Sequence, residues 1–325
     1  FQRTAGISIQ RSISRPLMAA KLQQHSKRSP RLGNRGNGHT NLCFNKYSCT
    51  LRLPNQPETL PSATKARKAV AVTGTSQQGQ RMQSGSGQKV AVLLAAYNGA
   101  PYLKEQFASL AGQDFPAIDI WLSDDGSSDD TLEIAERAAK NWSKGRFETI
   151  RRDAKPLGTS GNGIDFGQAL SRSNANFLSL IRNEAIEADY YAFCDQDDVW
   201  EPAKLSRAIA WLADQPEDAP AMHCSRTRII DASGQLGGLS ILFPKTPGFH
   251  NAIIQNIAAG NTIVMNRAAM NALRAHTIDG HFVSHDWWAY ILVTALGGKV
   301  KYDMKPLTRY RQHDGNLVGE NASWR

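Results

Sequence analysis

The sequence predicts an α/β fold in which a mostly parallel central sheet is flanked by helices. Apolar runs that are typical of buried strands alternate along residues 89–319 with segments whose apolar residues recur at helical spacing. Two of these runs end in acidic clusters, at residues 123–127 (SDDGS) and 195–200 (DQDDVW). Strands of an open α/β sheet present ligands at their carboxyl ends, so both clusters are expected at one crevice.

The individual elements follow from the apolar spacing and the turn residues. Strands are expected at residues 89–96, 118–122, 149–151, 190–194, 222–230 and 261–265. Helices are expected at residues 102–112, 131–141, 177–181, 202–212, 268–276 and 286–295. Residues 155–167 are rich in glycine and predict a loop, and residues 235–260 predict irregular structure. Asp129 or Asp130 is the expected N-cap of the second helix, and Asp198 is expected to cap the helix near Pro202.

The charge of the chain is concentrated in its first part. Residues 1–88 hold 14 Lys/Arg and one acid, whereas the remainder holds 24 basic and 28 acidic residues. The overall charge of +9 therefore comes from the tail. Because the folded part is net acidic, we expect no nucleic-acid partner for it. The tail is expected to be disordered over residues 1–88, and its charge suggests contact with an anionic membrane. Unchanged liposome binding after deletion of residues 1–81 would contradict that contact.

Composition also bears on the compartment. The four cysteines, Cys43, Cys49, Cys194 and Cys224, show no zinc-type or CxxC spacing and imply no disulfides, which fits a reducing compartment. No stretch approaches the roughly 18 apolar residues that a membrane span needs. We therefore expect a cytoplasmic location, with at most a peripheral position at the inner face of the plasma membrane.

The acidic clusters point to a metal. Crowded carboxylates repel one another, and a hard divalent cation is the usual way to relieve the repulsion. A cation with spare coordination positions suggests a diphosphate as a further ligand. The expected protein is a metal-dependent enzyme that acts on a nucleotide-activated substrate.

Five segments then resemble a known family in the same order and at similar spacing. They are residues 90–103 (VAVLLAAYNGAPYL), 122–131 (LSDDGSSDDT), 195–200 (DQDDVW), 285–288 (HDWW) and 310–313 (YRQH). Together they resemble the family 2 glycosyltransferases, and more narrowly the bacterial rhamnosyltransferase-like branch. The resemblance covers residues 88–319. It implies a GT-A fold with a donor half at about 89–200 and an acceptor half at about 201–319, a nucleotide-sugar donor, Mg²⁺ or Mn²⁺, and inversion at the anomeric carbon.

The resemblance assigns donor-binding roles to the first half. Tyr97 matches the position that packs against the donor base, and Ala96 stands where the family usually has Thr. Asp125 resembles the acid that accepts a hydrogen bond from the base N–H, with Asp124 beside it either in the donor site or as a loop acid. Arg311 offers a cation to the diphosphate, or else forms a structural salt bridge.

The metal is assigned to the second acidic cluster. By resemblance Asp197 binds Mg²⁺ or Mn²⁺, and Asp195 contacts the ribose or a metal-bound water. His313 resembles a histidine that completes the metal shell in some relatives, with a structural histidine as the alternative. Trp200 is expected to anchor this loop.

The acceptor side is assigned to the second half. Asp286, at the start of a helix, stands where the family places its general base, although an aspartate there could also serve as an N-cap. Trp287 and Trp288 are expected to stack on the acceptor sugar, with one of the two in the core. Asn261 matches a position that lines the acceptor side.

The leading hypothesis is thus transfer of a single sugar from dTDP-rhamnose or a UDP-sugar to a glycan or lipid-linked glycan in polysaccharide assembly. The chain lacks the Gln-x-x-Arg-Trp motif of the processive synthases, which favours single transfer. A sugar nucleotidyltransferase would need a Gly-rich basic signature after the first strand, where this chain has AAYNG. A non-catalytic protein that binds glycan or nucleotide would be expected to lack Asp197 or Asp286, and both are present.

Overall fold

A computed structural model of the chain describes residues 87–152, 159–160, 163–164, 166–276, 284–314 and 316. Apart from residues 87 and 88, the tail predicted at residues 1–88 lies outside the described residues. So do parts of the predicted Gly-rich loop. The described parts of that loop form a short hairpin, β4 (Thr159–Ser160) and β5 (Gly163–Ile164), and the start of a helix.

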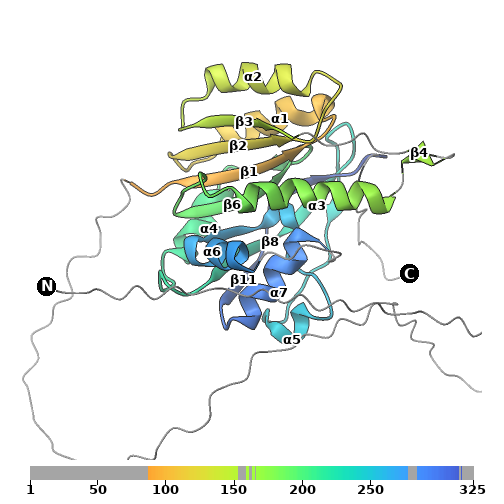
Figure 1. The fold of residues 1–325 in the computed structure, drawn as a ribbon. Coiled ribbons are helices and arrows are strands. Elements are labelled where there is room, and N and C mark those ends of the chain that lie inside the picture. The colour runs from red at the N-terminus through yellow and green to blue at the C-terminus, as the bar shows by residue number, and fades with distance from the viewer. Residues whose placement is uncertain are drawn as a thin grey trace, which may run out of the picture. The chain divides into compact units, whose positions relative to one another are not determined.

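A nine-stranded sheet forms the centre of the described body (Figure 1). Its strands are β1 (Val90–Ala96), β2 (Ile118–Asp124), β3 (Phe147–Arg151), β6 (Tyr190–Asp195), β7 (Val199–Trp200), β8 (Ala221–Ile230), β9 (Leu236–Leu239), β10 (Val264–Asn266) and β11 (Lys299–Arg311). Their order is β3-β2-β1-β6-β10-β8-β11-β7, with β9 beside β8. β3, β2, β1 and β6 run parallel, as do β8 and β11, whereas β10 lies antiparallel between β6 and β8. The predicted mostly parallel α/β sheet is confirmed.

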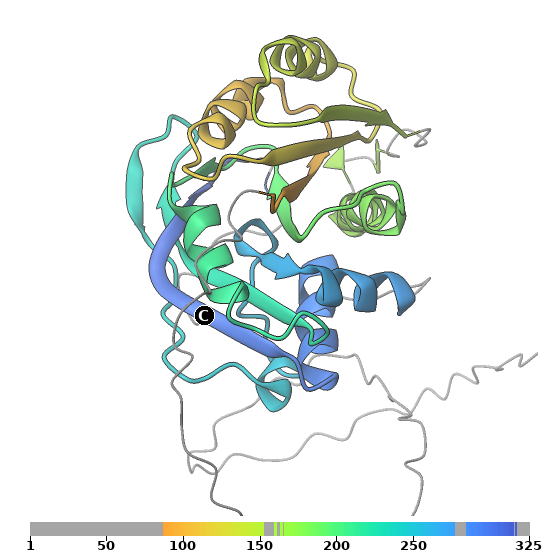
Figure 2. The same cartoon turned by 90° about the vertical axis from the view of Figure 1, so that its left-hand side faces the viewer.

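Helices cover both faces of the sheet (Figure 2). They are α1 (Ala100–Ala111), α2 (Thr131–Asn141), α3 (Phe166–Arg182), α4 (Lys204–Leu212), α5 (Phe249–Ala252), the 3₁₀ turn η1 (Gly260–Thr262), α6 (Arg267–Ala275) and α7 (His285–Ala295). α1, α2 and α4 pack on one face, and α3, α6 and α7 pack on the other. The side chains of β1 are buried on both sides, which is why residues 90–96 form a continuous apolar run.

Two expectations about elements were wrong, and one strand was not predicted. Residues 235–260 are not wholly irregular, since they contain β9 and α5. Residues 260–262 form a 3₁₀ turn, so the short strand begins at Val264. The terminal segment is a 13-residue strand, β11, whose alternation of charged and apolar residues is interrupted by a bulge between Asp303 and Thr308. That interruption hides the period of two on which strand prediction depends.

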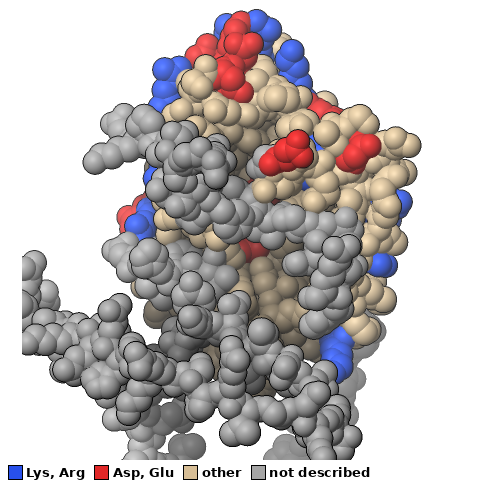
Figure 3. Space-filling model, turned by 90° about the vertical axis from the view of Figure 1, so that its right-hand side faces the viewer, with Lys and Arg blue, Asp and Glu red and all other residues tan. Residues whose placement is uncertain are grey.

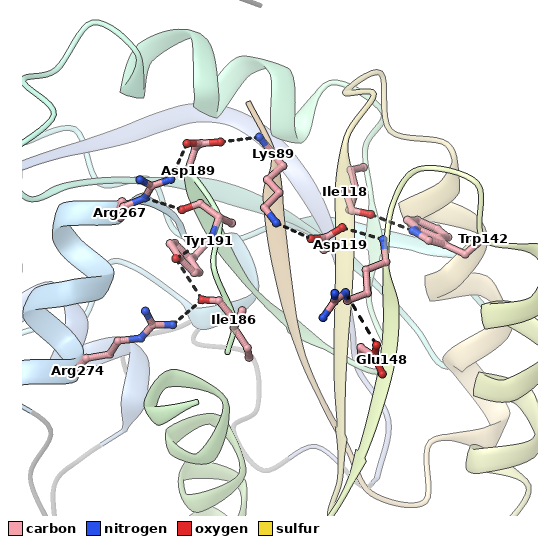
Figure 4. A network of polar contacts seen from close by, with 12 residues as sticks. Lys89, Ile118, Asp119, Trp142, Glu148, Ile186, Asp189, Tyr191, Arg267 and Arg274 are labelled. Atoms are coloured by element: carbon pink, nitrogen blue, oxygen red, sulfur yellow. Dashed lines mark hydrogen bonds and ion pairs between the residues drawn. The ribbon is translucent and has the colours of Figure 1, made fainter. Parts of the chain in front are cut away.

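The amino ends of the parallel strands are joined by charged side chains (Figure 4). The Lys89 ammonium lies 3.2 Å from Asp119, and its backbone N–H donates to Asp189 at 2.8 Å. Arg267 of α6 donates to the other oxygen of Asp189, also at 2.8 Å. These contacts connect the β1–β2 side of the sheet to α6. They lie at the amino ends of the strands and do not involve the acidic clusters at the carboxyl ends.

Candidate active site

The ends of three parallel strands bring the predicted site residues to one edge of the sheet. The register places Ala96 of β1 opposite Asp124 of β2, and Ala95 opposite Asp195 of β6. Because each strand stops there, the turns that follow at residues 97–99, 125–130 and 196–198 are neighbours. Figure 3 looks onto this side of the molecule, where acidic side chains are visible among uncharged residues.

The turn after β1 is held by the second acidic cluster. The Tyr97 N–H donates to Gln196 Oε1 at 2.8 Å, and Gln196 Nε2 donates to the Tyr97 carbonyl at 3.0 Å. A Cβ added at Gly99 would collide with the same Gln196 amide, which explains the glycine at this position. Gln196 was not predicted as a site residue, because the middle residue of an Asp-x-Asp carries no signal of its own. It fixes the predicted base-binding turn to the loop that carries Asp195 and Asp197.

The first acidic pair has two different environments. Asp124 is buried, and its Oδ2 accepts from the N–H groups of Gly126 and Ser127 at 3.1 Å. Its Oδ1 has no hydrogen-bond partner among the described residues. Asp124 therefore shapes the loop, as the loop-acid alternative predicts. Its second oxygen, Oδ1, is a buried acceptor that these loop contacts do not use.

Asp125 lies between two arginines that sequence reasoning missed. Its carboxylate binds the Arg152 guanidinium on one oxygen and Arg172 Nε on the other, the latter at 2.7 Å. The Arg172 guanidinium also lies over the Tyr97 ring, 4.7 Å from its centroid, and its Nη1 has no partner among the described residues. The predicted base-binding pair, Tyr97 and Asp125, is thus brought together with two cations. Neither arginine belongs to a motif. Arg152 directly follows β3 and Arg172 lies on α3, so their positions follow from the packing of these two elements beside β2.

Next to this turn lie Asp195, Asp197 and His313. His313 Nε2 is 2.8 Å from Asp197 Oδ2, so the end of β11 meets the second acidic cluster. Burial raises the pKa of Asp195 to about 7, with further contributions from the charges of Asp197 and Asp286. Mutual repulsion of this kind would be relieved by a cation, and in that respect the donor set fits a divalent metal.

The three predicted metal ligands do not form a closed site. No group of three His, Cys, Asp or Glu side chains is arranged around a common ion position among the described residues. The roles of Asp195, Asp197 and His313 as metal ligands therefore stay predictions. A magnesium-type site that uses one or two carboxylates and completes its shell with water and phosphate remains compatible with this geometry.

Asp198 is not the predicted helix cap. It is fully buried, its Oδ2 accepts from the Asn261 side chain, and its Oδ1 accepts from the backbone N–H of Arg311 at 3.1 Å. The N-cap of α4 is Ala203, with no side-chain cap bond. The N-cap of α2 is Asp130, one of the two predicted residues, but its side chain makes no cap bond, whereas Asp129 accepts from the N–H of Thr131 at 3.1 Å.

Asn261 is also corrected. Its side chain is 3% exposed and points at Asp198, and its carbonyl accepts from Lys204 Nζ, so it does not line the acceptor side. Lys204 is buried beneath the loop with its ammonium 3.4 Å from the Trp200 ring centroid, and burial lowers its pKa to about 7. Trp200 is 2% exposed and anchors the loop as predicted.

Asp286 lies in the first turn of α7, and its charge contributes to the raised pKa of Asp195. Its Oδ2 accepts from Asn256 Nδ2 and from the N–H of Gly260, both at 3.0 Å. Its Oδ1 accepts from the Ser284 hydroxyl and from the N–H of Trp287, the latter at 2.7 Å. Ser284 is the N-cap residue, so Asp286 is not the cap but a carboxylate held by donors from three segments.

The two tryptophans divide their roles. Trp288 packs against the core cluster of α3, α6 and α7, in agreement with the expectation that one of the pair is core. Trp287 is half-buried, and its indole N–H donates to the Ala252 carbonyl of α5 at 2.6 Å. This bond fixes the orientation of Trp287 beside Asp286.

His285, next to Asp286, gives a testable pH dependence. Its ring stacks on Phe177 at 3.8 Å, and burial lowers its pKa to about 4 from an ordinary 6.5. Between pH 6.5 and pH 4, His285 is protonated in the unfolded chain but neutral in the folded protein. The free energy of unfolding is therefore expected to fall as pH decreases from 6.5 toward 4. The loss attributable to this residue is up to about 3 kcal/mol.

Urea denaturation at pH 7 and pH 4.5 measures this effect. The variant His285→Phe keeps the stacked ring but cannot titrate, so its stability should change less between the two pH values. Equal losses in wild type and variant would show that His285 is not the group responsible.

Comparisons with known proteins bear on the family and the fold of the chain. The family model described as glycosyl transferase family 2 matches residues 91–271. The dTDP-rhamnosyl transferase RfbG of Shigella flexneri is 25% identical over 244 residues, which cover 71% of this chain and 75% of that protein. The amylovoran biosynthesis glycosyltransferase AmsB of Erwinia amylovora is 24% identical over 253 residues, covering 72% and 75%.

A solved structure shares the fold. S. aureus TarS 1–349, crystallised in complex with UDP-GlcNAc, superposes with a TM-score of 0.51 at 19% identity. The match covers 71% of this chain and 60% of the TarS chain. The family match includes the turn after β1 and both acidic clusters, whereas Asp286 and His313 lie beyond it.

Proposed function

Because the chain belongs to glycosyl transferase family 2, with the GT-A fold, we propose that it transfers a single sugar from a nucleotide-diphospho-sugar to a glycan acceptor, with inversion at the anomeric carbon. The observation that carries the proposal is the meeting of three groups at one sheet edge. They are the Tyr97–Asp125 pair with its arginines, the Asp195–Asp197 pair, and the oriented Asp286.

Donor recognition is proposed for the Tyr97 side. A nucleobase stacked on Tyr97 would replace the guanidinium of Arg172 there, and the base N–H would donate to Asp125. The displaced arginine, or Arg152, would then offer its N–H groups to the diphosphate. Arg311 is left out of this site, because its guanidinium is buried and bonded to protein groups.

Mg²⁺ or Mn²⁺ would be held by Asp197, with Asp195 close by. When bound, the cation would neutralise the negative charge that grows on the leaving diphosphate. Gln196, which stands between Asp195 and Asp197, holds their loop against the Tyr97 turn.

Asp286 is proposed as the general base. A single in-line displacement needs one group to take the proton from the acceptor hydroxyl as its oxygen attacks the anomeric carbon. Asp286 is held on both oxygens, so its orientation is set before the acceptor arrives. Trp287 beside it would offer a stacking surface to the acceptor sugar.

L-Rhamnose from dTDP-rhamnose is the proposed donor, and a cell-surface polysaccharide the proposed destination. The support is the likeness to a dTDP-rhamnosyl transferase and to an enzyme of amylovoran biosynthesis.

None of the described helices is long and apolar enough to cross a membrane.

Titration calorimetry of dTDP and of UDP into the 325-residue chain, with and without Mn²⁺, tests the proposal. Mn²⁺-dependent binding with a preference for dTDP is the expected result. A preference for UDP would overturn the rhamnosyl donor but support a nucleotide-sugar transferase. Failure of a folded protein to bind either nucleotide would overturn the proposed function.

A further inference from the structure

Arg311 is buried at the place where β11 meets the second acidic cluster. Its side chain is 2% exposed, although an arginine at a strand end would ordinarily reach solvent. Its Nε donates to the Asp197 carbonyl at 2.8 Å, and its Nη1 donates to the carbonyls of Asp231 and Ala232 at 3.3 and 3.1 Å. Its Nη2 pairs with Glu105 of α1. The guanidinium therefore has protein acceptors on all three nitrogens.

The backbone of the same strand end is fixed to the same loop. The Arg311 N–H donates to Asp198 Oδ1 at 3.1 Å, and two residues later His313 Nε2 lies 2.8 Å from Asp197 Oδ2. Asp197 is thus held at its carbonyl by Arg311 and at its carboxylate by His313.

A single aromatic ring of α1 supports both contacts. Tyr102 lies with its ring centroid 5.0 Å from the Arg311 guanidinium carbon and 4.7 Å from the centroid of the stacked His313 ring. Stacking and cation–π attraction restrict the motion of both side chains. Since Glu105 lies less than one turn farther along α1, this helix supplies both the ring and the counter-charge.

We propose that Arg311 is a positioning residue that, with Tyr102 and Glu105, sets the orientation of the Asp197 carboxylate for a divalent cation. The inference rests on the proposed function, in which Asp197 holds that cation. It replaces the expectation that Arg311 contacts the diphosphate. Groups that orient a metal ligand without touching the metal commonly change metal affinity by about 10–100-fold when they are removed.

The same strand provides a matched control. Arg309 lies two residues before Arg311 and pairs with Glu201, but its side chain is 42% exposed and, within the described part of the chain, makes no hydrogen bond to residues 195–198. Arg309→Met removes an arginine and an ion pair of the same strand without touching Asp197. Tyr102→Leu and Tyr102→Phe form a second matched pair, because only the phenylalanine variant keeps the ring.

The effect is measured as Mn²⁺ affinity in the presence of the nucleotide that the wild type binds. The electron paramagnetic resonance signal of free Mn²⁺ reports how much of the ion is bound. Arg311→Met and Tyr102→Leu are expected to weaken Mn²⁺ affinity by about 10–100-fold. Arg309→Met and Tyr102→Phe should stay within about twofold of wild type. Metal-free binding of the nucleotide should be unchanged in all four, because the Tyr97 side is intact.

The outcomes separate this inference from the proposed function. Absence of Mn²⁺-dependent nucleotide binding in the wild type overturns the function itself. Wild-type Mn²⁺ affinity in a folded Arg311→Met protein overturns the inference alone. If that variant does not fold, the Tyr102 pair decides, and equal Mn²⁺ affinities of the leucine and phenylalanine variants overturn the inference. An equal loss of metal-free nucleotide binding also overturns it, because the site as a whole would then be disturbed.

Discussion

Replacement of Asp286 by asparagine is expected to lower kcat by about 10²–10⁴-fold, the range that a general base contributes. Nucleotide affinity should be nearly unchanged, since Tyr97 and Asp125 lie on other segments. An asparagine keeps one oxygen for Asn256 or Gly260, but its amide group cannot accept the proton of a sugar hydroxyl. The measurement is steady-state kinetics with donor and acceptor, with the KM of the donor determined separately.

Two comparisons sharpen the assignment of the base. Asn256→Ala removes one donor to Asp286 and leaves its carboxylate in place, so it should lower kcat far less than Asp286→Asn. Asp195 is the competing candidate, because its pKa is raised to about 7 and it lies near Asp286. A bound cation would favour its charged form and make it a ligand instead. If Asp195→Asn abolished turnover without changing Mn²⁺ binding while Asp286→Asn remained active, the base would be Asp195.

The sequence was informative wherever strand ends determine position. Asp125, Asp195 and Tyr97 each follow an apolar run that forms a parallel strand, and the register of three such strands brings them to one edge. The same reasoning could not tell which polar residues near a motif point outward. Asp198 was predicted to cap a helix and Asn261 to line the acceptor side. The two side chains instead bind each other under the loop, because the 3₁₀ turn at residues 260–262 directs Asn261 inward.

Arginines show the limit of sequence reasoning most clearly. Arg311 belongs to a motif, and yet its guanidinium binds protein groups instead of a ligand. Arg152 and Arg172 belong to no motif, and both pair with Asp125. A long cationic side chain can reach an acidic group from several directions. Which arginine is buried depends on the packing of α1, α3 and β11, and that packing is decided by residues far apart in the chain.

Asp197→Asn is expected to abolish most of the Mn²⁺-dependent gain in nucleotide affinity and to lower kcat by about 10²–10³-fold. The asparagine oxygen can still accept from His313, so the contact that joins β11 to the loop survives and the fold should be retained. What is lost is the negative charge that would attract a divalent cation. Calorimetry of the nucleotide with and without Mn²⁺ gives the affinity, and circular dichroism checks the fold.

His313→Gln is the informative companion to this variant. If His313 only orients Asp197, glutamine can still donate a hydrogen bond to it, and Mn²⁺ affinity should fall less than in Asp197→Asn. If His313 were itself a metal ligand, the two variants would lose comparable affinity. Unchanged Mn²⁺ dependence in Asp197→Asn would contradict the metal role of this cluster. The acidic crowding at Asp195 would then have to be relieved by protonation, as its raised pKa allows.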